Sequence, residues 1–243
     1  MNSQSIPPHP TPVVFYVVRH GQTLFNVTNR VQGWCDSPLT EEGRRVALML
    51  GAGLARVPFV RAYASDSQRT LDTAALILQA QHEAVCAHDE RACAQELLQC
   101  KGDARLREWC YGDLEGGSGE RLRETLAQGF GEELSFAELN ERLVEVADIL
   151  AQADTSGRAE YFETIETRLR SFFEQIGTEV QREGGGNVLV VTHAFVVRTL
   201  VYLLDRTRVN TPLKIQNASV TQITYDQGLF QLGEIGSVAW IDQ

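Results

Sequence analysis

The chain has 243 residues, of which 43% are hydrophobic, enough for one large α/β domain or two small ones. Its net charge of −10 argues against a general nucleic-acid or anionic-membrane binder, because both functions need a basic face. A small anionic substrate is not excluded, because a few converging arginines can dominate the local electrostatic potential.

The first twelve residues, MNSQSIPPHPTP, have neither a basic start nor an apolar core, so they do not resemble a signal peptide. We expect a disordered leader over residues 1–12 and a single domain over residues 13–243. No uncharged segment is long enough to cross a bilayer. The five cysteines lack C-x-x-C spacing, which predicts reduced thiols in a cytoplasmic protein rather than a zinc site or a disulfide framework.

A run of β-branched and aromatic residues over 13–18 predicts a buried strand. Arg19, His20 and Gly21 follow at its carboxyl end, where open α/β sheets bind their ligands. Because glycine has no Cβ, Gly21 would allow an anion to approach the backbone closely. We therefore expect a functional site at this end of the strand.

Two helices are expected in the first third of the chain. Thr40 is predicted to cap a helix that runs through Leu54. A short strand over 60–64 leads to another helix, for which Asp66 or Ser67 would be the cap. Arg69 then lies in the first turn of that helix, one helical step beyond a strand end.

The rest of the chain predicts further strands and helices. Residues 81–103 have no clean period and suggest a short strand with an irregular or helical excursion. Residues 120–183 are largely helical, and the part over about 116–160 is expected to form a helical lid.

Near the carboxyl terminus, an apolar strand over 187–192 ends at His193, and a helix over 196–204 follows it. The segments 218–225 and 229–234 predict a β-hairpin. Strands that alternate with helices predict an α/β fold, with a mostly parallel sheet and helices on both faces.

The carboxyl ends of parallel strands meet at one edge of a sheet, so Arg19, His20, Arg69 and His193 are expected to converge. Two arginines can bind a phosphoryl group through bidentate hydrogen bonds. The nearby cations would lower the pKa of His20 and keep its ring neutral and nucleophilic. His193 would stabilise the charge of the transition state, and Asn26 would offer an amide to the same oxygens.

These motifs resemble the histidine phosphatase superfamily, which has the phosphoglycerate mutase-like fold. The resemblance spans about residues 13–235. It rests on an ordered set of short segments: Arg19-His20-Gly21-Gln22-Thr23 with Asn26, Gln32-Gly33, Asp36-Ser37-Pro38-Leu39-Thr40, Ser65-Asp66 with Arg69-Thr70 and Thr73-Ala74, Leu106-Arg107-Glu108 with Gly112 and Glu115-Gly116, Thr192-His193, and Asn217-Ala218-Ser219.

The resemblance implies a three-layer sandwich and a mechanism. His20 would be phosphorylated, while Arg19, Arg69 and His193 hold the phosphate. Glu108 would be the general acid, with a pKa raised by a partly apolar setting. No metal ion and no other cofactor is expected.

Several of these residues also have simpler interpretations. Glu108 could be a surface carboxylate paired with Arg107, and Asn26 could only cap a turn. Thr23 would shape the loop and could also touch the phosphate. Arg121 and Arg123 could contact a substrate carboxylate from the lid, or they could lie on a solvated helix face.

We expect a metal-independent phosphatase (a hydrolase) that acts on a small phosphorylated metabolite through a phosphohistidine. The alternative is a phosphoglycerate mutase with the same phosphohistidine, but the acidic balance of residues 116–133 fits a doubly anionic phosphoglycerate poorly. An alternative from another class is a non-catalytic binding protein of the same fold.

The expected partner is a small phosphomonoester, with no nucleic acid and no membrane. The oligomeric state stays open, with a homodimer as one option.

Overall fold

The computed structural model describes residues 11–87 and 96–241, which contain a six-stranded sheet with the strand order β3-β2-β4-β1-β5-β6. Strands β1, β2, β3 and β4 run parallel to one another, while β5 is antiparallel to β1 and forms an antiparallel hairpin with β6 at one edge. This arrangement confirms the predicted α/β fold. The strands are β1 (Val13–Arg19), β2 (Phe59–Ala64), β3 (Cys100–Gly102), β4 (Gly186–Thr192), β5 (Val220–Asp226) and β6 (Leu229–Leu232).

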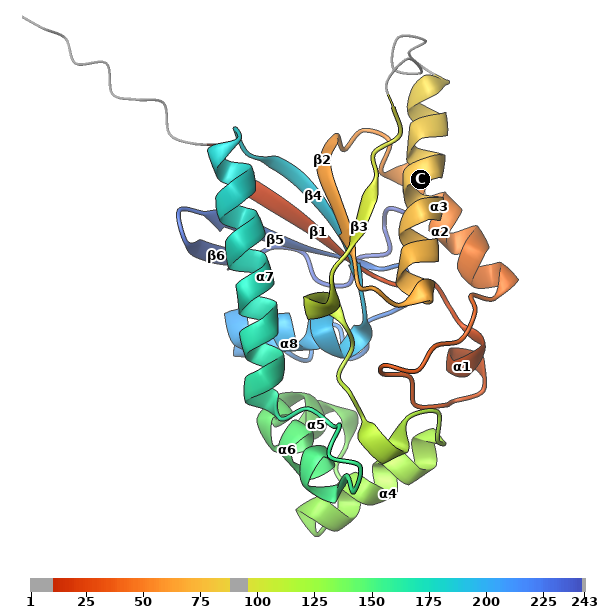
Figure 1. The fold of residues 1–243 in the computed structure, drawn as a ribbon, viewed down its shortest axis with the longest axis vertical. Coiled ribbons are helices and arrows are strands. Elements are labelled where there is room, and N and C mark those ends of the chain that lie inside the picture. Colours follow the sequence, from red (N-terminus) through yellow and green to blue (C-terminus); the bar gives the residue numbers. More distant parts are fainter. Residues whose placement is uncertain (1–10, 88–95, 242–243) are drawn as a thin grey trace, which may run out of the picture.

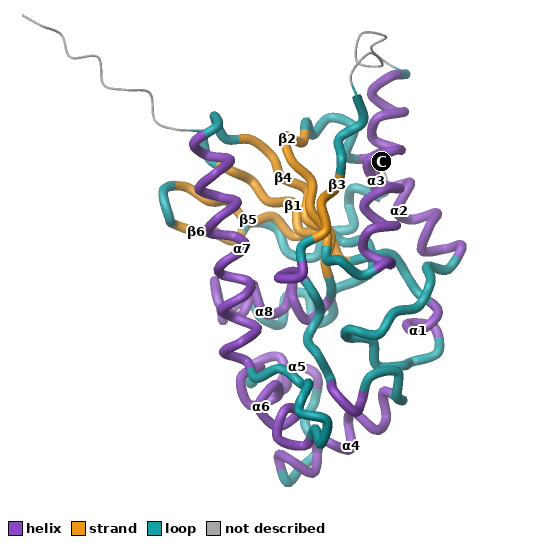
Figure 2. Tube along the Cα trace, viewed as in Figure 1, coloured by secondary structure: helices purple, strands orange, loops and turns teal. Residues whose placement is uncertain are grey.

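Helices cover both faces of the sheet (Figures 1 and 2). Helices α2 and α3 lie on one face and α7 lies on the other, while α4, α5 and α6 form a separate group beyond one end of the sheet (Figure 1). The helices are α1 (Leu24–Val27), α2 (Glu41–Gly53), α3 (Gln68–Cys86), α4 (Gly119–Phe130), α5 (Phe136–Glu141), α6 (Leu143–Ala153), α7 (Phe162–Arg182) and α8 (Ala194–Leu204).

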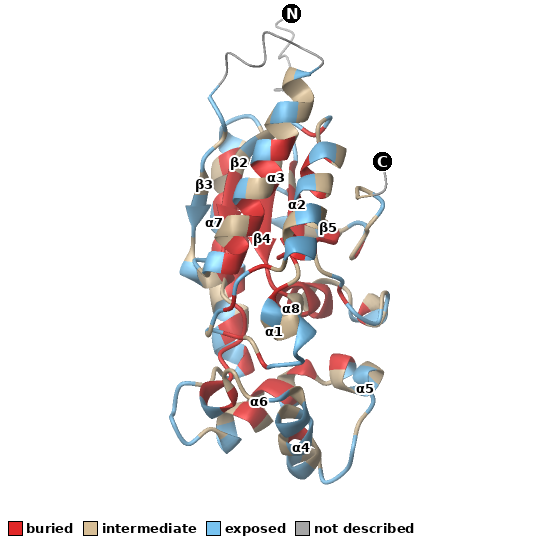
Figure 3. Ribbon diagram, turned by 90° about the vertical axis from the view of Figure 1, so that its right-hand side faces the viewer, coloured by how far each residue is buried: buried red, intermediate tan, exposed pale blue. Residues whose placement is uncertain are grey.

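The central strand β1 has buried side chains on both faces and connects two hydrophobic cores. Its neighbour β4 is likewise buried, as Figure 3 shows. Phe15 belongs to the core beneath α7, where its ring meets that of Phe173 edge-on at 5.0 Å between centroids. Tyr16 and Val18 point to the opposite face and join the core beneath α2 and α3. Because alternate side chains of a strand point to opposite faces, the continuous apolar run in the sequence reflects burial on both sides. The carboxyl end of β1 is thereby fixed in position.

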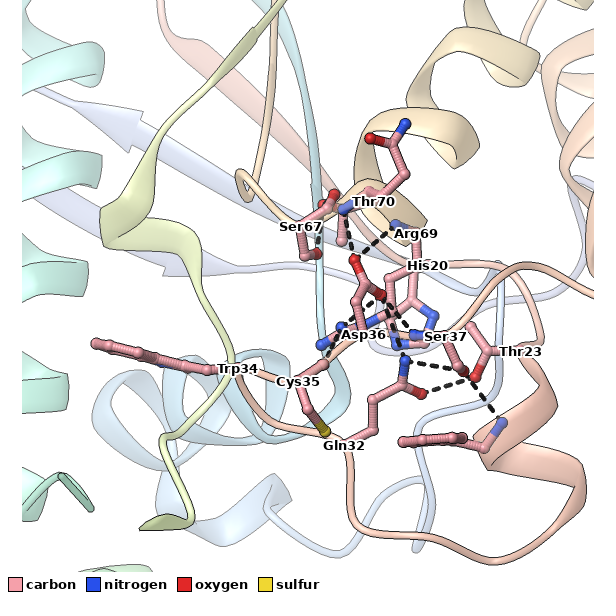
Figure 4. A network of polar contacts seen from close by, with 12 residues as sticks. His20, Thr23, Gln32, Trp34, Cys35, Asp36, Ser37, Ser67, Arg69 and Thr70 are labelled. Carbon is pink, nitrogen blue, oxygen red and sulfur yellow. Dashed lines mark hydrogen bonds and ion pairs between the residues drawn. The ribbon is translucent and has the colours of Figure 1, made fainter. Parts of the chain in front are cut away.

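The helix caps are partly as expected. Thr40 caps α2, because its side chain accepts a hydrogen bond from the Gly43 N–H at 2.9 Å. Helix α3 begins at Gln68, yet neither Asp66 nor Ser67 caps it through its side chain. Instead Asp36, from a distant loop, accepts from the Gln68 N–H at 2.6 Å (Figure 4). This carboxylate at the positive end of the helix joins the loop to α3.

The segment over 81–103 is partly helical and partly extended, with residues 88–95 outside the described part of the chain. Helix α3 continues to Cys86, and β3 follows at Cys100. Cys86 is disulfide-bonded, which corrects the expectation that its thiol is reduced.

The expected leader also lies outside the described residues, except for its last two positions. None of the described helices is both long and apolar enough to cross a membrane.

Candidate active site

His20 follows β1 directly, and its side chain is buried with only 4% of the residue exposed. The ring Nδ1 lies 2.8 Å from the carbonyl oxygen of Gly21. Because a carbonyl oxygen can only accept, Nδ1 must carry the proton of the neutral ring. The lone pair is then on Nε2, which is the nitrogen available for attack.

The surroundings keep the His20 ring neutral. Burial lowers the pKa of His20 well below 6.5, and the charges of Arg69 and Arg19 lower it further. The hydrogen bond to Gly21 opposes these effects, but it is the smallest of them. An unprotonated His20 is therefore present at neutral pH, as the sequence predicted.

His193 lies at the carboxyl end of β4, next to the first histidine. Its ring centroid is 5.3 Å from that of His20, and only 1% of the residue is exposed. The Arg69 Nη2 group donates to His193 Nδ1 at 3.0 Å. Since Nδ1 accepts, the proton of the neutral ring is on Nε2. The two histidines thus carry opposite tautomers, one with a free lone pair and one with a free N–H.

Arg69 is almost fully buried and is held at three points by one loop (Figure 4). Its Nη1 group donates to the Cys35 carbonyl and to Asp36 Oδ1, both at 2.9 Å, and its Nη2 group donates to the Gly33 carbonyl at 2.7 Å. These bonds fix the plane of the guanidinium group. Its remaining Nε–H is therefore pre-oriented for a ligand.

Three buried N–H groups of this site have no hydrogen-bond partner among the described residues: Arg19 Nε, Arg69 Nε and His193 Nε2. A buried donor without a partner costs about 1–3 kcal/mol, so such groups are rare unless a ligand satisfies them. Two of the donors belong to cationic side chains, and the third belongs to a neutral histidine. An anion with several acceptor oxygens, such as a phosphoryl group, fits this set. The described residues contain no group of three or more His, Cys, Asp or Glu side chains arranged to hold a metal ion.

Glu108 is buried, with 5% of the residue exposed, and it is not paired with Arg107. Its Oε1 accepts from the Trp109 N–H and its Oε2 from the Phe195 N–H, both at 3.0 Å. Arg107 instead forms an ion pair with Asp66 at 2.6 Å. The interpretation of Glu108 as a surface carboxylate is therefore wrong. Burial raises the pKa of Glu108 above its usual 4.5, so this group can hold a proton for transfer.

The segment that carries Glu108 is fixed by Arg168 of α7. This side chain donates to the carbonyls of Arg105, Arg107 and Glu108 at 2.6–3.0 Å. It also forms an ion pair with Glu160 at 2.8 Å. The carboxylate position thus depends on a helix about sixty residues further along the chain.

The three residues expected to bind substrate also have structural partners. Thr23 Oγ1 donates to Gln32 Oε1 at 2.7 Å, and Asn26 Oδ1 accepts from the Thr23 N–H at 3.1 Å in a capping box of α1. The Gly21 N–H donates to Thr73 Oγ1. A Cβ on Gly21 would lie 2.7 Å from the Gly43 carbonyl, so the missing side chain allows α2 to pack here. Substrate contacts by Thr23, Asn26 and Gly21 stay predictions.

Glu115 has a role that the sequence did not reveal. Its carboxylate accepts from the backbone N–H groups of Gly33, Trp34, Cys35 and Tyr111 at 2.9–3.2 Å. The same loop provides the carbonyls that hold Arg69. Glu115 therefore positions Arg69 indirectly, by ordering the loop.

We expect Glu115→Gln to destabilise the protein by about 2 kcal/mol, because an amide NH₂ cannot accept from the N–H groups that the lost oxygen served. The kcat/KM for any phosphomonoester should fall with it, since Arg69 loses its fixed orientation. Thermal denaturation and steady-state kinetics test this. An unchanged melting temperature together with unchanged kcat/KM would contradict the proposed role.

The pKa shifts predict a pH–rate profile with an acidic and an alkaline limb for alkyl phosphates. Protonation of His20 removes the nucleophile, so kcat/KM should fall as the pH drops through its lowered pKa, below 6.5. Loss of the Glu108 proton removes the acid, so kcat/KM should also fall as the pH rises through its raised pKa, above 4.5. A pH–rate profile measures both limbs. A kcat/KM that does not fall on the acidic side would contradict the assignment of His20, and one that does not fall on the alkaline side would contradict that of Glu108.

Comparisons with known proteins identify the family of the chain. Residues 15–237 match the model of the histidine phosphatase superfamily (branch 1). A 2,3-bisphosphoglycerate-dependent phosphoglycerate mutase of Gloeobacter violaceus is 32% identical over 189 residues, which are 78% of this chain and 74% of the relative. The crystal structure of a phosphoglycerate mutase from Bacillus anthracis covers 96% of each chain, with a TM-score of 0.85 and 35% identity.

An α-ribazole phosphatase from Shigella flexneri shares the fold, with a TM-score of 0.66 and 22% identity over 93% of this chain and 98% of the other. Proteins named as mutases and as phosphatases thus have this architecture. The family match covers nearly the whole chain and includes the residues that meet at the carboxyl end of the sheet. The chain therefore belongs to the histidine phosphatase superfamily, whose members are phosphoryl-transfer enzymes.

Proposed function

We propose that the protein hydrolyses small phosphomonoesters through a phosphohistidine formed at Nε2 of His20. The observation that carries this proposal is the set of unpaired N–H groups on Arg19, Arg69 and His193 beside a neutral histidine. These donors would bind the non-bridging oxygens of a phosphoryl group. The charge of the two arginines would do the electrostatic work that a metal ion does in other phosphatases.

The reaction has two steps. In the first, a bond forms between His20 Nε2 and phosphorus, the bond from phosphorus to the alcohol oxygen breaks, and Glu108 gives its proton to that oxygen. In the second, water attacks the phosphohistidine while the Glu108 carboxylate takes a proton from it. The bond between nitrogen and phosphorus then breaks, which releases phosphate and restores neutral His20 and protonated Glu108.

A cavity of about 470 Å³ adjoins Arg19, and we call it the substrate cavity. Its volume is that of a small-molecule site. Exposed residues at its rim include Arg30, Phe136 and Lys214, so water can reach it from solvent. A phosphatase must admit water, whereas a mutase must exclude it from the phosphoenzyme. This access favours hydrolysis.

The predicted lid is involved only in part. Phe136 and Asn140 of α5 line the substrate cavity, but no residue of α4 does. Arg121 instead lines a separate cavity, and both Arg121 and Arg123 are exposed on α4. These two arginines are therefore not positioned to contact a substrate in this conformation.

Phosphoglycerate mutase activity is the second candidate, because two relatives with that name are 32% and 35% identical to this chain. The two reactions differ in the fate of the phosphoryl group. Rapid-quench labelling with ³²P-phosphoglycerate would show released phosphate for a phosphatase, and isomerised phosphoglycerate with little free phosphate for a mutase. The second result would overturn our choice.

An aryl phosphate assay tests for catalysis itself. Turnover is expected with and without a chelator, since the proposed mechanism uses no metal ion. The absence of turnover with every phosphomonoester would indicate a non-catalytic binding protein. Activity that disappears in chelator would contradict the metal-free mechanism.

A further inference from the structure

We propose that the water that hydrolyses the phosphohistidine enters through a second cavity, separate from the substrate cavity, and is positioned there by the Ser65 hydroxyl. This inference rests on the proposed function, because it concerns the second step of the same reaction. It is carried by the residues that line the two cavities, by a buried hydroxyl without a partner, and by the different charges in the two cavities.

The second cavity has a volume of about 380 Å³ and leads from solvent to the proposed catalytic acid. Its inner wall contains three buried residues, Ser65, Glu108 and His193, and the exposed residues Trp34 and Gln68 lie at its mouth. The substrate cavity contains neither Glu108 nor His193, and the two cavities share no lining residue. The catalytic groups therefore have two separate openings to solvent.

Ser65 lies in the inner wall of the second cavity with an unused hydroxyl group. The residue is fully buried, and Ser65 Oγ has no hydrogen-bond partner among the described residues. Leaving a buried hydroxyl unpaired is unfavourable, so such groups normally bind a protein group or a water. A serine hydroxyl can both donate and accept, and the cavity has room for several waters. Water is therefore the complementary ligand.

The fold fixes Ser65 beside the segment that carries Glu108. Ser65 follows β2, and its N–H donates to the Val191 carbonyl of β4 at 2.9 Å. The next residue of β4, Thr192, donates through Oγ1 to the Leu106 carbonyl at 2.8 Å, two residues before Glu108. The ends of both strands and the Glu108 segment are thereby joined, so a water bound to Ser65 is held near the acid.

Glu108 can accept a proton from a water in this position. Its two oxygens accept from the N–H groups of Trp109 and Phe195, and each carboxylate oxygen has a second lone pair for another donor. In the second step, the water gives one proton to Glu108 and donates its other O–H to Ser65 Oγ. Its oxygen forms the new bond to phosphorus while the bond from phosphorus to His20 Nε2 breaks.

The charges in the two cavities favour different molecules. Four cationic side chains line the substrate cavity, and none of the described residues that line it is a carboxylate. In the second cavity, Arg107 is paired with Asp66 at 2.6 Å, and Asp36 is paired with Arg69 at 2.9 Å. An anionic ester is therefore attracted to the substrate cavity, whereas neutral water needs no counter-charge.

Two openings also separate the release of the alcohol from the attack of water. After the first step, the alcohol lies in the substrate cavity and hinders water that approaches through that cavity. Water from the second cavity can take the place of the alcohol oxygen beside Glu108 as soon as that oxygen moves away. Hydrolysis then does not have to wait until the substrate cavity is empty.

Ser65→Ala tests the positioning of the water. Single-turnover reactions with an aryl phosphate, quenched in alkali, measure the formation and the decay of the phosphohistidine separately. We expect formation and kcat/KM to stay within about twofold of the wild type, because Ser65 acts only after the aryl alcohol has left. The decay should slow by about five- to tenfold through the loss of one orienting hydrogen bond.

A merely structural role of Ser65 would give a different result. The melting temperature of Ser65→Ala should not fall, because the substitution removes an unpaired hydroxyl from the interior. Ser171→Ala, at an exposed position of α7, is the control and should change neither rate. A lower melting temperature, with formation and decay slowed by the same factor, would overturn the inference.

Ser67→Phe tests the route of the water by adding bulk to the second cavity. Ser67 is a half-buried residue of this cavity, and its Oγ lies 2.9 Å from Thr70 Oγ1. The added ring should slow the decay by about fivefold and leave the formation unchanged, because it hinders only the water. Ser67→Ala is the matched control, since it loses the same hydrogen bond without filling the cavity. It should decay at the wild-type rate.

The possible outcomes separate this inference from the proposed function. A wild-type rate of decay in both Ser65→Ala and Ser67→Phe would overturn the inference and leave the phosphohistidine mechanism standing. A lower kcat/KM of Ser67→Phe for large esters, with unchanged decay, would show that the second cavity holds the alcohol and would also overturn it. If the wild type forms no phosphohistidine from any phosphomonoester, the proposed function fails and the inference fails with it.

Discussion

Replacing His20 with alanine is expected to lower kcat by at least about 10⁴-fold, because no other side chain that the structure describes near the phosphoryl site can take over as nucleophile. His193 cannot replace it, since its Nδ1 lone pair is engaged by Arg69 and its Nε2 carries the proton. Steady-state kinetics with an aryl phosphate measure the loss. An effect smaller than tenfold would refute the assignment of the nucleophile.

The stability of this variant should change little. Among the described residues, the His20 side chain makes one hydrogen bond, to the Gly21 carbonyl, and its burial between cations is unfavourable for any charge on the ring. Thermal denaturation should show a loss of no more than about 2 kcal/mol. His82→Ala on α3 is a control, because that residue is only partly buried and lies outside the site. It should retain full activity.

The Glu108→Gln variant should separate substrates by their leaving group. An alkyl alcohol needs a proton to leave, so kcat/KM for an alkyl phosphate is expected to fall by about 10²–10⁴-fold. An aryl alcohol leaves without this help, and kcat/KM for an aryl phosphate should fall by less than about tenfold. Equal losses for the two substrates would show that Glu108 is not the acid.

The second step should also be affected in this variant. Without a base, water attacks the phosphohistidine slowly, so pre-steady-state kinetics with an aryl phosphate should show a burst of phenol followed by slow turnover. Glu174→Gln is the matched control, since this carboxylate is exposed on α7. It should behave as the wild type. The absence of a burst, with steady turnover, would contradict the role of Glu108 as base.

Much of the fold follows from local patterns in the sequence. The strand that leads to His20 and the strand that leads to His193 are continuous apolar runs because both of their faces are buried. Because β1 and β4 are parallel neighbours, Arg19 pairs in register with Thr192 and the two histidines follow at the same level. Their proximity could therefore be predicted from strand direction alone.

The contacts that tune the site could not be predicted in this way, because their partners are far apart in the chain. Asp36 caps α3 and pairs with Arg69, and Glu115 binds a loop about eighty residues earlier. Arg168 holds the Glu108 segment through three carbonyls, which carry no sequence signal at all. The short helix α1 was missed because its cap, Thr23, belongs to a motif that suggested ligand binding.

The substrate cavity shows the same limit. The acidic sequence over 116–133 argued against a second anion on the substrate, but those residues do not line the cavity. Its cations come from three separate segments, represented by Arg30, Arg198 and Lys214. Only the folded chain brings them together, so composition near the Glu108 motif is a poor guide to the charge of the site.

The most direct test is to locate the phosphoryl group on the enzyme during turnover. The protein would be mixed with substrate, quenched in alkali to preserve phosphohistidine, and examined by peptide mass spectrometry and ³¹P NMR. We expect phosphate on His20, bonded to Nε2. The proposed mechanism would be contradicted by phosphate on His193, on Nδ1 of His20 or on a carboxylate. Turnover with no phosphoenzyme at all would also contradict it.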